Sequence, residues 1–241
     1  MQYPYRITAH SGCEGTPRDS KESIIKALTL GADVVEVDVR RAPDGTLVIS
    51  HDRKDSYSGM LSLQEAMELV AEDGKIGINC DIKEAEVALD VLQMAQSLGI
   101  TKERLILSGG LTPAQLRASP QIIQQCNPYL NLEEIMGEIL NIPPELAESS
   151  LWESIRDEIQ DISPYLPDIS RIFHEVGAKA LNLPYTPLTQ PCFDLAQEIP
   201  LSAWTINELA VMEKMIRLGV VNLTTLNVKL AMQLRETIPT R

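Results

Sequence analysis

Two acidic residues alternate with valines near the start of the chain. Residues 34–39 read Val-Val-Glu-Val-Asp-Val. Since side chains alternate across a β-strand, Glu36 and Asp38 would share one face and the valines the other. Taken alone, this pattern is typical of a strand with one solvent-facing side. The residues elsewhere in the sequence indicate chemistry instead.

Other candidate residues come where predicted strands end. A short strand predicted over 6–9 leads to His10. A strand predicted over 75–82 carries Asp81, and Lys83 follows two residues later on the same face. In a barrel of alternating strands and helices, the carboxyl ends of the strands meet at one mouth. These side chains would therefore converge there with the acidic pair.

A second histidine follows the acidic strand. Asp44-Gly45 is typical of a hairpin turn, and the strand predicted over 46–50 returns to His51 and Asp52. Two of the three histidines of the chain thus fall in this small region. Histidines at such a site are suited to act as general acid and general base.

The acidic residues predict a cation site. Three carboxylates that face one barrel mouth repel each other and are costly to remove from water. A hard divalent cation would offset that cost, and ligation by oxygen alone favours Mg²⁺ or Ca²⁺ over Zn²⁺. The three residues are Glu36, Asp38 and Asp81.

The elements that would position these residues alternate between strands and helices. Strands are predicted to begin near residues 6, 34, 75, 105, 122, 178, 201 and 222, and most are followed by a helical pattern. This alternation over 241 residues predicts an α/β fold, a (β/α)8 TIM barrel, with a doubly wound sheet as the alternative. With no linker and no shift in composition, we expect 1–241 to form a single TIM-barrel domain.

The segment 127–177 is too long for one simple connection. Its pattern is helical, acidic and interrupted by prolines. We expect one helix of the barrel repeat plus a helical excursion between the fifth and sixth strands. Four aromatic residues would line a pocket or lid, or would instead belong to helices packed on the barrel or on a second copy of the chain: Tyr129, Trp152, Tyr165 and Phe173.

The composition restricts the partners. A net charge of −13, from 34 acidic and 21 basic residues, argues against nucleic-acid binding. Four sparse cysteines suit a reducing compartment, and no signal peptide is visible, so we expect a cytoplasmic protein. No apolar run approaches the roughly 20 residues of a membrane helix, so we expect no membrane span. An oligomer is possible.

Several separated motifs resemble those of the glycerophosphodiester phosphodiesterase family. They occur in the family's order and span nearly the whole chain outside 127–177. The main ones are Ala9-His10-Ser11-Gly12, Glu36-Val37-Asp38, His51-Asp52, Asp81-Ile82-Lys83 and Trp204-Thr205-Ile206-Asn207. The resemblance implies an eight-stranded α/β barrel that hydrolyses a small-molecule phosphodiester with the help of a divalent metal.

The resemblance also implies a role for each residue. Three acids fall on metal-ligand positions: Glu36, Asp38 and Asp81. Two histidines fall on the acid/base pair: His10 and His51. Lys83 falls on a phosphate-contacting position, and Trp204 on an aromatic wall of the substrate pocket.

The sequence departs from the family pattern in places. Ser11 stands where the family usually has Arg, and Pro17-Arg18-Asp19-Ser20 replaces Pro-Glu-Asn-Thr. We hypothesise that Arg18 reaches the phosphate in place of the lost Arg; the alternative is a surface Arg that opens a helix. Asp81 stands where the family usually has Glu. The related sphingomyelinase D enzymes also have Asp at this position. The segment 52–62 is too short to contain the family's inserted subdomain, which helps to frame the alcohol site. The identity of the substrate therefore does not follow from the resemblance.

The main functional hypothesis is metal-dependent hydrolysis of a glycerophosphodiester to glycerol phosphate and an alcohol. His10 is assigned as base and His51 as acid, although the sequence does not fix their order. The attacking oxygen would come from water or from a neighbouring hydroxyl of the substrate, which would first give a cyclic phosphate. Two alternatives are a lysophospholipase D- or sphingomyelinase D-like enzyme with another headgroup, and a non-catalytic barrel that binds a phosphate ligand.

Overall fold

Eight parallel strands form a closed barrel in the computed structural model, which describes residues 5–142 and 147–237, with side chains at 5–142 and 153–237. β1 pairs with both β2 and β9, and this closes the sheet. The barrel strands are β1 (Arg6–Ala9), β2 (Val34–Arg41), β4 (Gly77–Ile82), β5 (Leu105–Gly109), β6 (Asn127–Asn131), β7 (Ala180–Pro184), β8 (Leu201–Trp204) and β9 (Asn222–Thr225). The predicted TIM barrel is therefore confirmed, and the doubly wound alternative is wrong.

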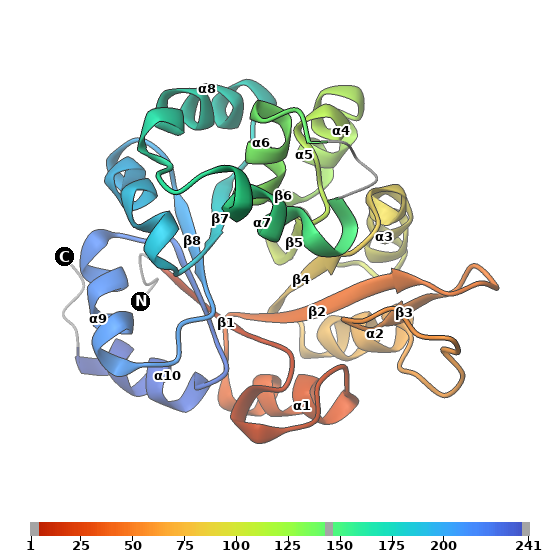
Figure 1. Cartoon of the computed structure of the whole chain (residues 1–241). Helices are drawn as coiled ribbons and strands as arrows, with labels where there is room; N and C mark the ends of the chain where they lie inside the picture. The colour runs from red at the N-terminus through yellow and green to blue at the C-terminus, as the bar shows by residue number, and fades with distance from the viewer. Residues whose placement is uncertain (1–4, 143–146, 238–241) are drawn as a thin grey trace.

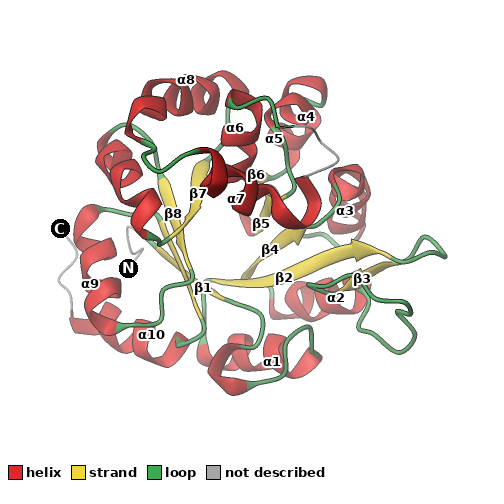
Figure 2. Ribbon diagram, viewed as in Figure 1, coloured by secondary structure: helices red, strands yellow, loops and turns green. Residues whose placement is uncertain are grey.

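Helices surround the barrel, with the strands at the centre (Figures 1 and 2). The α-helices are α1 (Lys21–Leu30), α2 (Leu63–Asp73), α3 (Ala88–Ser97), α4 (Pro113–Ala118), α5 (Gln121–Gln125), α6 (Leu132–Ile139), α7 (Ala147–Glu158), α8 (Leu166–Val176), α9 (Leu209–Leu218) and α10 (Val228–Thr237). A 3₁₀ segment, η6 (Pro187–Gln197), connects β7 to β8. Local sequence sets the helix starts: Ser20 caps α1 by accepting the Ser23 N–H, and Ser62 opens α2 with a capping box.

A hairpin extends β2 beyond the barrel. β3 (Leu47–Ile49) runs antiparallel to the far half of β2, and Figure 1 shows this pair reaching away from the other strands. The Ser50 N–H donates to the Asp38 carbonyl at 2.9 Å. The hairpin therefore brings the chain after β3 back beside Asp38.

The predicted fifth strand was misplaced. The segment 122–126 was expected to be a strand, but 121–125 form helix α5, and β6 begins at Asn127. Ile122 and Cys126 are four residues apart and both buried, which is the spacing of one helix face. β6 itself contains Pro128, a residue that weakens any strand signal. The other strands begin within two residues of the predicted positions.

The barrel interior is apolar at its base and polar above. The residues at the base are Val34, Ile106, Tyr129 and Ala180. Above them, each side chain donates a hydrogen bond of 2.7 to 2.9 Å to the next along the series Thr8, Asn222, Ser202, Asn182 and Asn131. The mouth of the barrel therefore rests on a buried, hydrogen-bonded polar layer.

The helical excursion lies between β6 and β7, the fifth and sixth barrel strands, as predicted. Its described aromatic side chains pack against the core or the barrel interior and do not line the predicted pocket or lid. Tyr129 belongs to the base of the barrel, Phe173 is a buried residue of α8, and Tyr165 packs against the core. Trp152 falls outside the described side chains. The alternative of helices packed on the barrel is thus the correct one for the described residues.

None of the described helices combines the length and the apolar character needed to cross a bilayer.

Candidate active site

Three carboxylates converge at the carboxyl ends of two neighbouring strands. Glu36 and Asp38 lie on β2, and Asp81 lies on β4 directly opposite Asp38 in the sheet register. One carboxylate oxygen from each lies within 4.8 Å of the others. Glu36 and Asp38 are buried, whereas Asp81 is partly exposed. The convergence expected from strand alternation is therefore present.

Burial makes this acidic cluster costly to ionise. Burial raises the pKa of Glu36 well above its ordinary value, and the charges of Asp38 and Asp81 raise it further. Burial also raises the pKa of Asp38, although the Lys83 ammonium opposes this shift. The cluster therefore needs positive charge to stay anionic.

Lys83 supplies part of that charge. Its Nζ lies 2.6 Å from Asp38 Oδ1 and 2.7 Å from Asp81 Oδ2. Burial opposes the charged ammonium, but the two carboxylates outweigh it and raise the pKa of Lys83. Lys83 is thus held as a cation at the position where the resemblance implies a phosphate contact.

The carboxylate oxygens of the cluster that do not contact Lys83 are suited to bind a hard cation. Within the described chain, Asp38 Oδ2 is buried and accepts no hydrogen bond. Arg18 Nη2 approaches this oxygen at 3.7 Å, which is ion-pair range and too long for a hydrogen bond. A set of carboxylate oxygens that includes a buried acceptor without a hydrogen bond fits a hard divalent cation.

Gly109 makes room for the third carboxylate. It ends β5 with φ of +83°, in the left-handed region that favours glycine. A Cβ at this position would overlap Asp81 Oδ1 and the Ile82 carbonyl oxygen. A side chain at position 109 would therefore displace Asp81 from the cluster.

His10 lies at the edge of the cluster. It follows β1, and its backbone N–H donates to the Thr225 carbonyl at 3.0 Å. Its Nδ1 lies 3.9 Å from Glu36 Oε2 and 3.1 Å from the Ser11 carbonyl oxygen. Burial lowers the pKa of His10, which favours the neutral imidazole needed in a general base.

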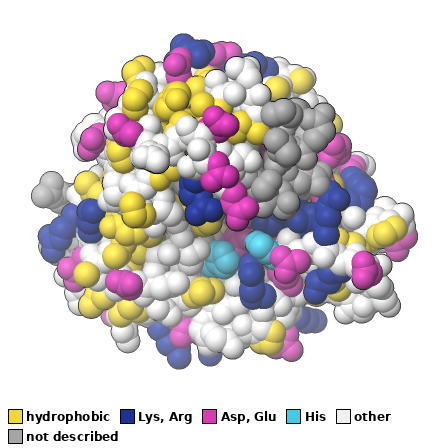
Figure 3. Space-filling view, in the orientation of Figure 1, with side chains coloured by type: hydrophobic (Ala, Val, Ile, Leu, Met, Phe, Trp, Pro, Cys, Tyr) yellow, Lys and Arg dark blue, Asp and Glu magenta, His cyan; other side chains and the backbone are white. Residues whose placement is uncertain are grey.

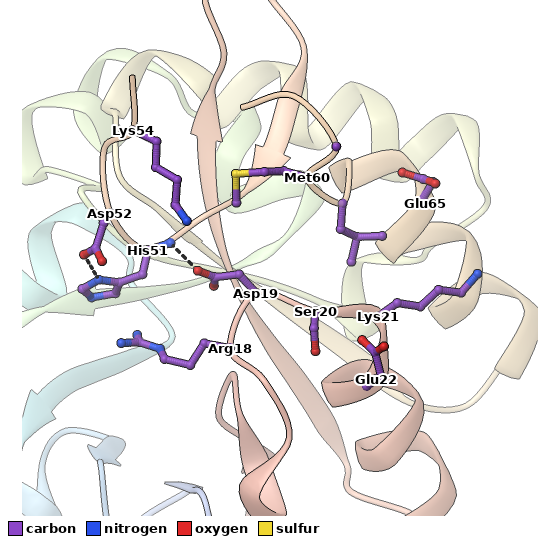
Figure 4. A pocket seen from close by; sticks show the side chains of 12 residues that line it. Arg18, Asp19, Ser20, Lys21, Glu22, His51, Asp52, Lys54, Met60 and Glu65 are labelled. Atoms are coloured by element: carbon purple, nitrogen blue, oxygen red, sulfur yellow. Dashed lines mark hydrogen bonds and ion pairs between the residues drawn. The ribbon is translucent and has the colours of Figure 1, made fainter. Parts of the chain in front are cut away.

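His51 lies on the other side of the mouth, at a surface groove of about 630 Å³ (Figure 4). Its Nδ1 is 2.7 Å from Asp52 Oδ1, and its side chain is 44% exposed. Arg18 lines the same groove, and Figure 4 shows its side chain extending in the same direction as that of His51. The charge on Asp38 interacts with both His10 and His51. In Figure 3, histidine side chains flank a recess that has acidic side chains within it.

Trp204 ends β8 on the inner face of the barrel. It is two residues after Ser202, whose hydroxyl takes part in the interior polar layer, so the two side chains share a face. The Trp204 side chain is partly buried, and its Nε1 has no hydrogen-bond partner among the described residues. This position is compatible with the predicted aromatic wall.

Sequence reasoning missed two further acids near the mouth. Glu133 Oε1 accepts a 2.9 Å hydrogen bond from Asn131 Nδ2, and burial raises the pKa of Glu133 to about 7. Burial raises the pKa of Glu134 to about 8, with the charges of Glu133 and Asp81 adding to the shift. They follow β6, so a correct position for that strand would have marked them as strand-end residues.

The fold and this site together define a class of protein, an α/β barrel with an acidic cluster and histidines at its mouth. Residues 10–94 match the model of the glycerophosphoryl diester phosphodiesterase family. The matched segment contains His10, Glu36, Asp38, His51, Asp81 and Lys83. This match confirms the predicted resemblance to that family over this part of the chain.

Solved structures share the fold over almost the entire chain. A glycerophosphodiester phosphodiesterase from Parabacteroides distasonis is 18% identical with a TM-score of 0.68, covering 98% of this chain and 99% of that one. A putative one from Silicibacter pomeroyi is 14% identical with a TM-score of 0.70, covering 98% and 95%. An Oleispira antarctica phosphodiesterase, solved with the product sn-glycerol-3-phosphate, is 17% identical with a TM-score of 0.63, covering 96% of each. No curated protein matches the sequence.

Proposed function

We propose that this chain, acting as a single barrel domain, hydrolyses a glycerophosphodiester to glycerol phosphate and a free alcohol. The observation that carries the proposal is the convergence of Glu36, Asp38 and Asp81 within 4.8 Å, with one buried Asp38 oxygen that accepts no hydrogen bond from the described residues. These three residues would hold Mg²⁺ or Ca²⁺. The product bound to the Oleispira relative supports a glycerol phosphate product here.

The cationic side chains would bind the substrate phosphate. Lys83 and Arg18 both approach Asp38, at 2.6 and 3.7 Å, and so would lie close to a phosphate placed at the cluster. When bound, a divalent cation would supply additional positive charge to the non-bridging phosphoryl oxygens. Trp204 would form an apolar wall of the pocket.

The two histidines would move the protons. His10, kept neutral by burial, would take the proton of the attacking oxygen as its bond to phosphorus forms. His51 would give a proton to the leaving alkoxide as the other phosphorus–oxygen bond breaks. Asp52 accepts from His51 Nδ1 and would stabilise the imidazolium. The groove beside His51 would accommodate the departing alcohol.

Phosphorus NMR of several glycerophosphodiesters, with Mg²⁺ or Ca²⁺ and then with chelator, tests this proposal. We expect glycerol phosphate to form with the cation and not with chelator. A cyclic phosphate would instead show attack by a hydroxyl of the substrate. Binding without turnover would refute the proposal in favour of a phosphate-ligand-binding barrel.

The location of the protein is a separate proposal. All four cysteines are buried and free. This state favours a reducing compartment such as the cytoplasm.

A further inference from the structure

Among the described residues, little surrounds the His51 ring to fix its orientation. His51 follows β3 and precedes an irregular loop over 52–61. Its ring contacts Asp52, but the Asp52 side chain is itself 78% exposed. Exposed pairs of this kind contribute little to order. The direction of the ring therefore depends on how the backbone at residue 51 is held.

That backbone is held from two sides. Asp19 Oδ2 accepts the His51 N–H at 3.0 Å, as Figure 4 shows. Arg40 Nε donates to the His51 carbonyl oxygen at 3.1 Å. Arg40 is buried, and its Nη1 lies 2.7 Å from Glu84 Oε1, so its guanidinium is itself fixed. Both peptide groups flanking the His51 Cα are thus bonded to charged side chains.

Asp19 is tied in turn to the first histidine through Ser11. The Ser11 hydroxyl accepts the Asp19 N–H at 2.9 Å and donates to Asp19 Oδ1 at 3.3 Å. The Ser11 N–H donates to Glu36 Oε2 at 2.9 Å, and the Ser11 carbonyl oxygen lies 3.1 Å from His10 Nδ1. One buried serine therefore contacts His10, the acidic cluster and the residue that holds His51.

The backbone at Asp19 adds to this evidence. Asp19 has φ of +54°, which a non-glycine residue adopts at a cost on the order of 1 kcal/mol. Asp and Asn tolerate this conformation better than other side chains. The chain therefore keeps an unfavourable conformation at the position where the carboxylate meets both Ser11 and His51.

We propose that Ser11 and Asp19 form a positioning bridge that sets the separation of His10 and His51, with Arg40 fixing His51 from the opposite side. The inference rests on the proposed function, in which these histidines are base and acid. It gives a role to Ser11 at the position where the family resemblance leads one to expect Arg. A bridge of this kind acts on the rate of the chemical step, because a displacement of about 1 Å can cost on the order of 100-fold in rate.

Turnover by point variants tests the bridge. Asp19→Ala removes the acceptor, and we expect kcat to fall about 10- to 100-fold with KM changed less than about threefold. Asp19→Asn keeps an acceptor oxygen and tolerates the same φ, so it should retain most of the activity. Asp44→Ala is the matched control, because Asp44 also accepts a backbone N–H in the β2–β3 hairpin, from Thr46 at 2.9 Å, and should behave as wild type. In a His51→Ala background, Asp19→Ala should cause no further loss.

Imidazole NMR tests the bridge without relying on turnover. The chain has three histidines, and His174 is exposed on α8, so its signal is an internal reference. Asp19→Ala should shift or broaden the His51 and His10 signals and leave that of His174 unchanged. Wild-type kcat and unchanged His51 signals in Asp19→Ala would overturn the inference, as would equal losses in Asp19→Asn and Asp19→Ala. A wild-type protein that turns over no phosphodiester while its signals respond as expected would refute the proposed function and keep the bridge.

Discussion

Replacing Glu133 with Gln is expected to make the stability of the protein less dependent on pH between about pH 5 and pH 8.5. Glu133 Oε1 accepts the last hydrogen bond of the series that begins at Thr8, and its Oε2 is buried without a hydrogen bond within the described chain. Burial raises the pKa of Glu133 from 4.5 to about 7. Between these two values the folded state keeps a proton that the unfolded state has released. Stability therefore falls as pH rises through this window and stays lower above it.

The magnitude follows from the shift. Raising the pKa of this carboxyl from 4.5 to about 7 corresponds to an upper limit of about 3.4 kcal/mol, at about 1.36 kcal/mol for each tenfold change in proton affinity. Glu133 is only partly buried, so solvent reduces this to about 1 to 2 kcal/mol. Gln keeps the oxygen that accepts from Asn131 and cannot ionise. Its amide NH₂ would lie unpaired near the Oε2 position, at a cost of about 1 kcal/mol that does not depend on pH.

Urea unfolding at pH 5 and pH 8.5, with chelator present, measures the effect. The free energy of unfolding of Glu133→Gln relative to wild type should be higher at pH 8.5 than at pH 5 by about 1 to 2 kcal/mol. Glu72→Gln, at an exposed position on α2, is the control and should show no such difference. Equal values at the two pH values, or a change of the opposite sign, would refute the reasoning.

The remaining predictions concern the mouth directly. Asp38→Asn should abolish most cation binding measured by calorimetry, since it removes a ligand charge, and cation affinity equal to wild type would contradict the assignment. His10→Ala should lower kcat by roughly 10² to 10⁴-fold, and the acidic limb of the wild-type pH profile should lie below pH 6.5 because burial lowers the pKa of His10. Gly109→Ala should destabilise the protein by about 1 to 3 kcal/mol in urea unfolding, because φ is +83° and a Cβ would meet Asp81; an unchanged midpoint would count against this. Arg18→Ala should lower kcat/KM about tenfold if Arg18 contacts the phosphate, and full activity would end that hypothesis.

Much of the candidate site could be predicted from the alternation of side chains along a β-strand. Alternation alone placed Glu36 and Asp38 on one face of β2, and the parallel pairing of β2 with β4 brought Asp81 beside them. His10 and Lys83 followed because each comes directly after a strand. These inferences require only the positions at which strands end, and the turn residues and helical patterns that follow the strands indicate those positions.

The rest depended on contacts that sequence spacing does not reveal. β6 was misplaced because an apolar run at helical spacing precedes it and a proline lies within it, and Glu133 was missed as a result. The bridge through Ser11 and Asp19 joins residues from three separate segments by side-chain hydrogen bonds. The distance from Arg18 to Asp38 likewise depends on the path of a loop, and only the structure supplies it.

The extended length of β2 has a consequence for how substrate choice could change. One face of this strand carries Glu36, Asp38 and Arg40, so a single rigid element sets the spacing between the acidic cluster and the anchor of His51. An insertion of one residue within β2 would reverse the face of every later residue of the strand and disable the reacting centre. The irregular loop over 53–60 is not part of β2 and does not set this spacing, but it borders the groove beside His51. Grafting loops of other lengths there would vary the alcohol that is recognised while the chemistry stays in place.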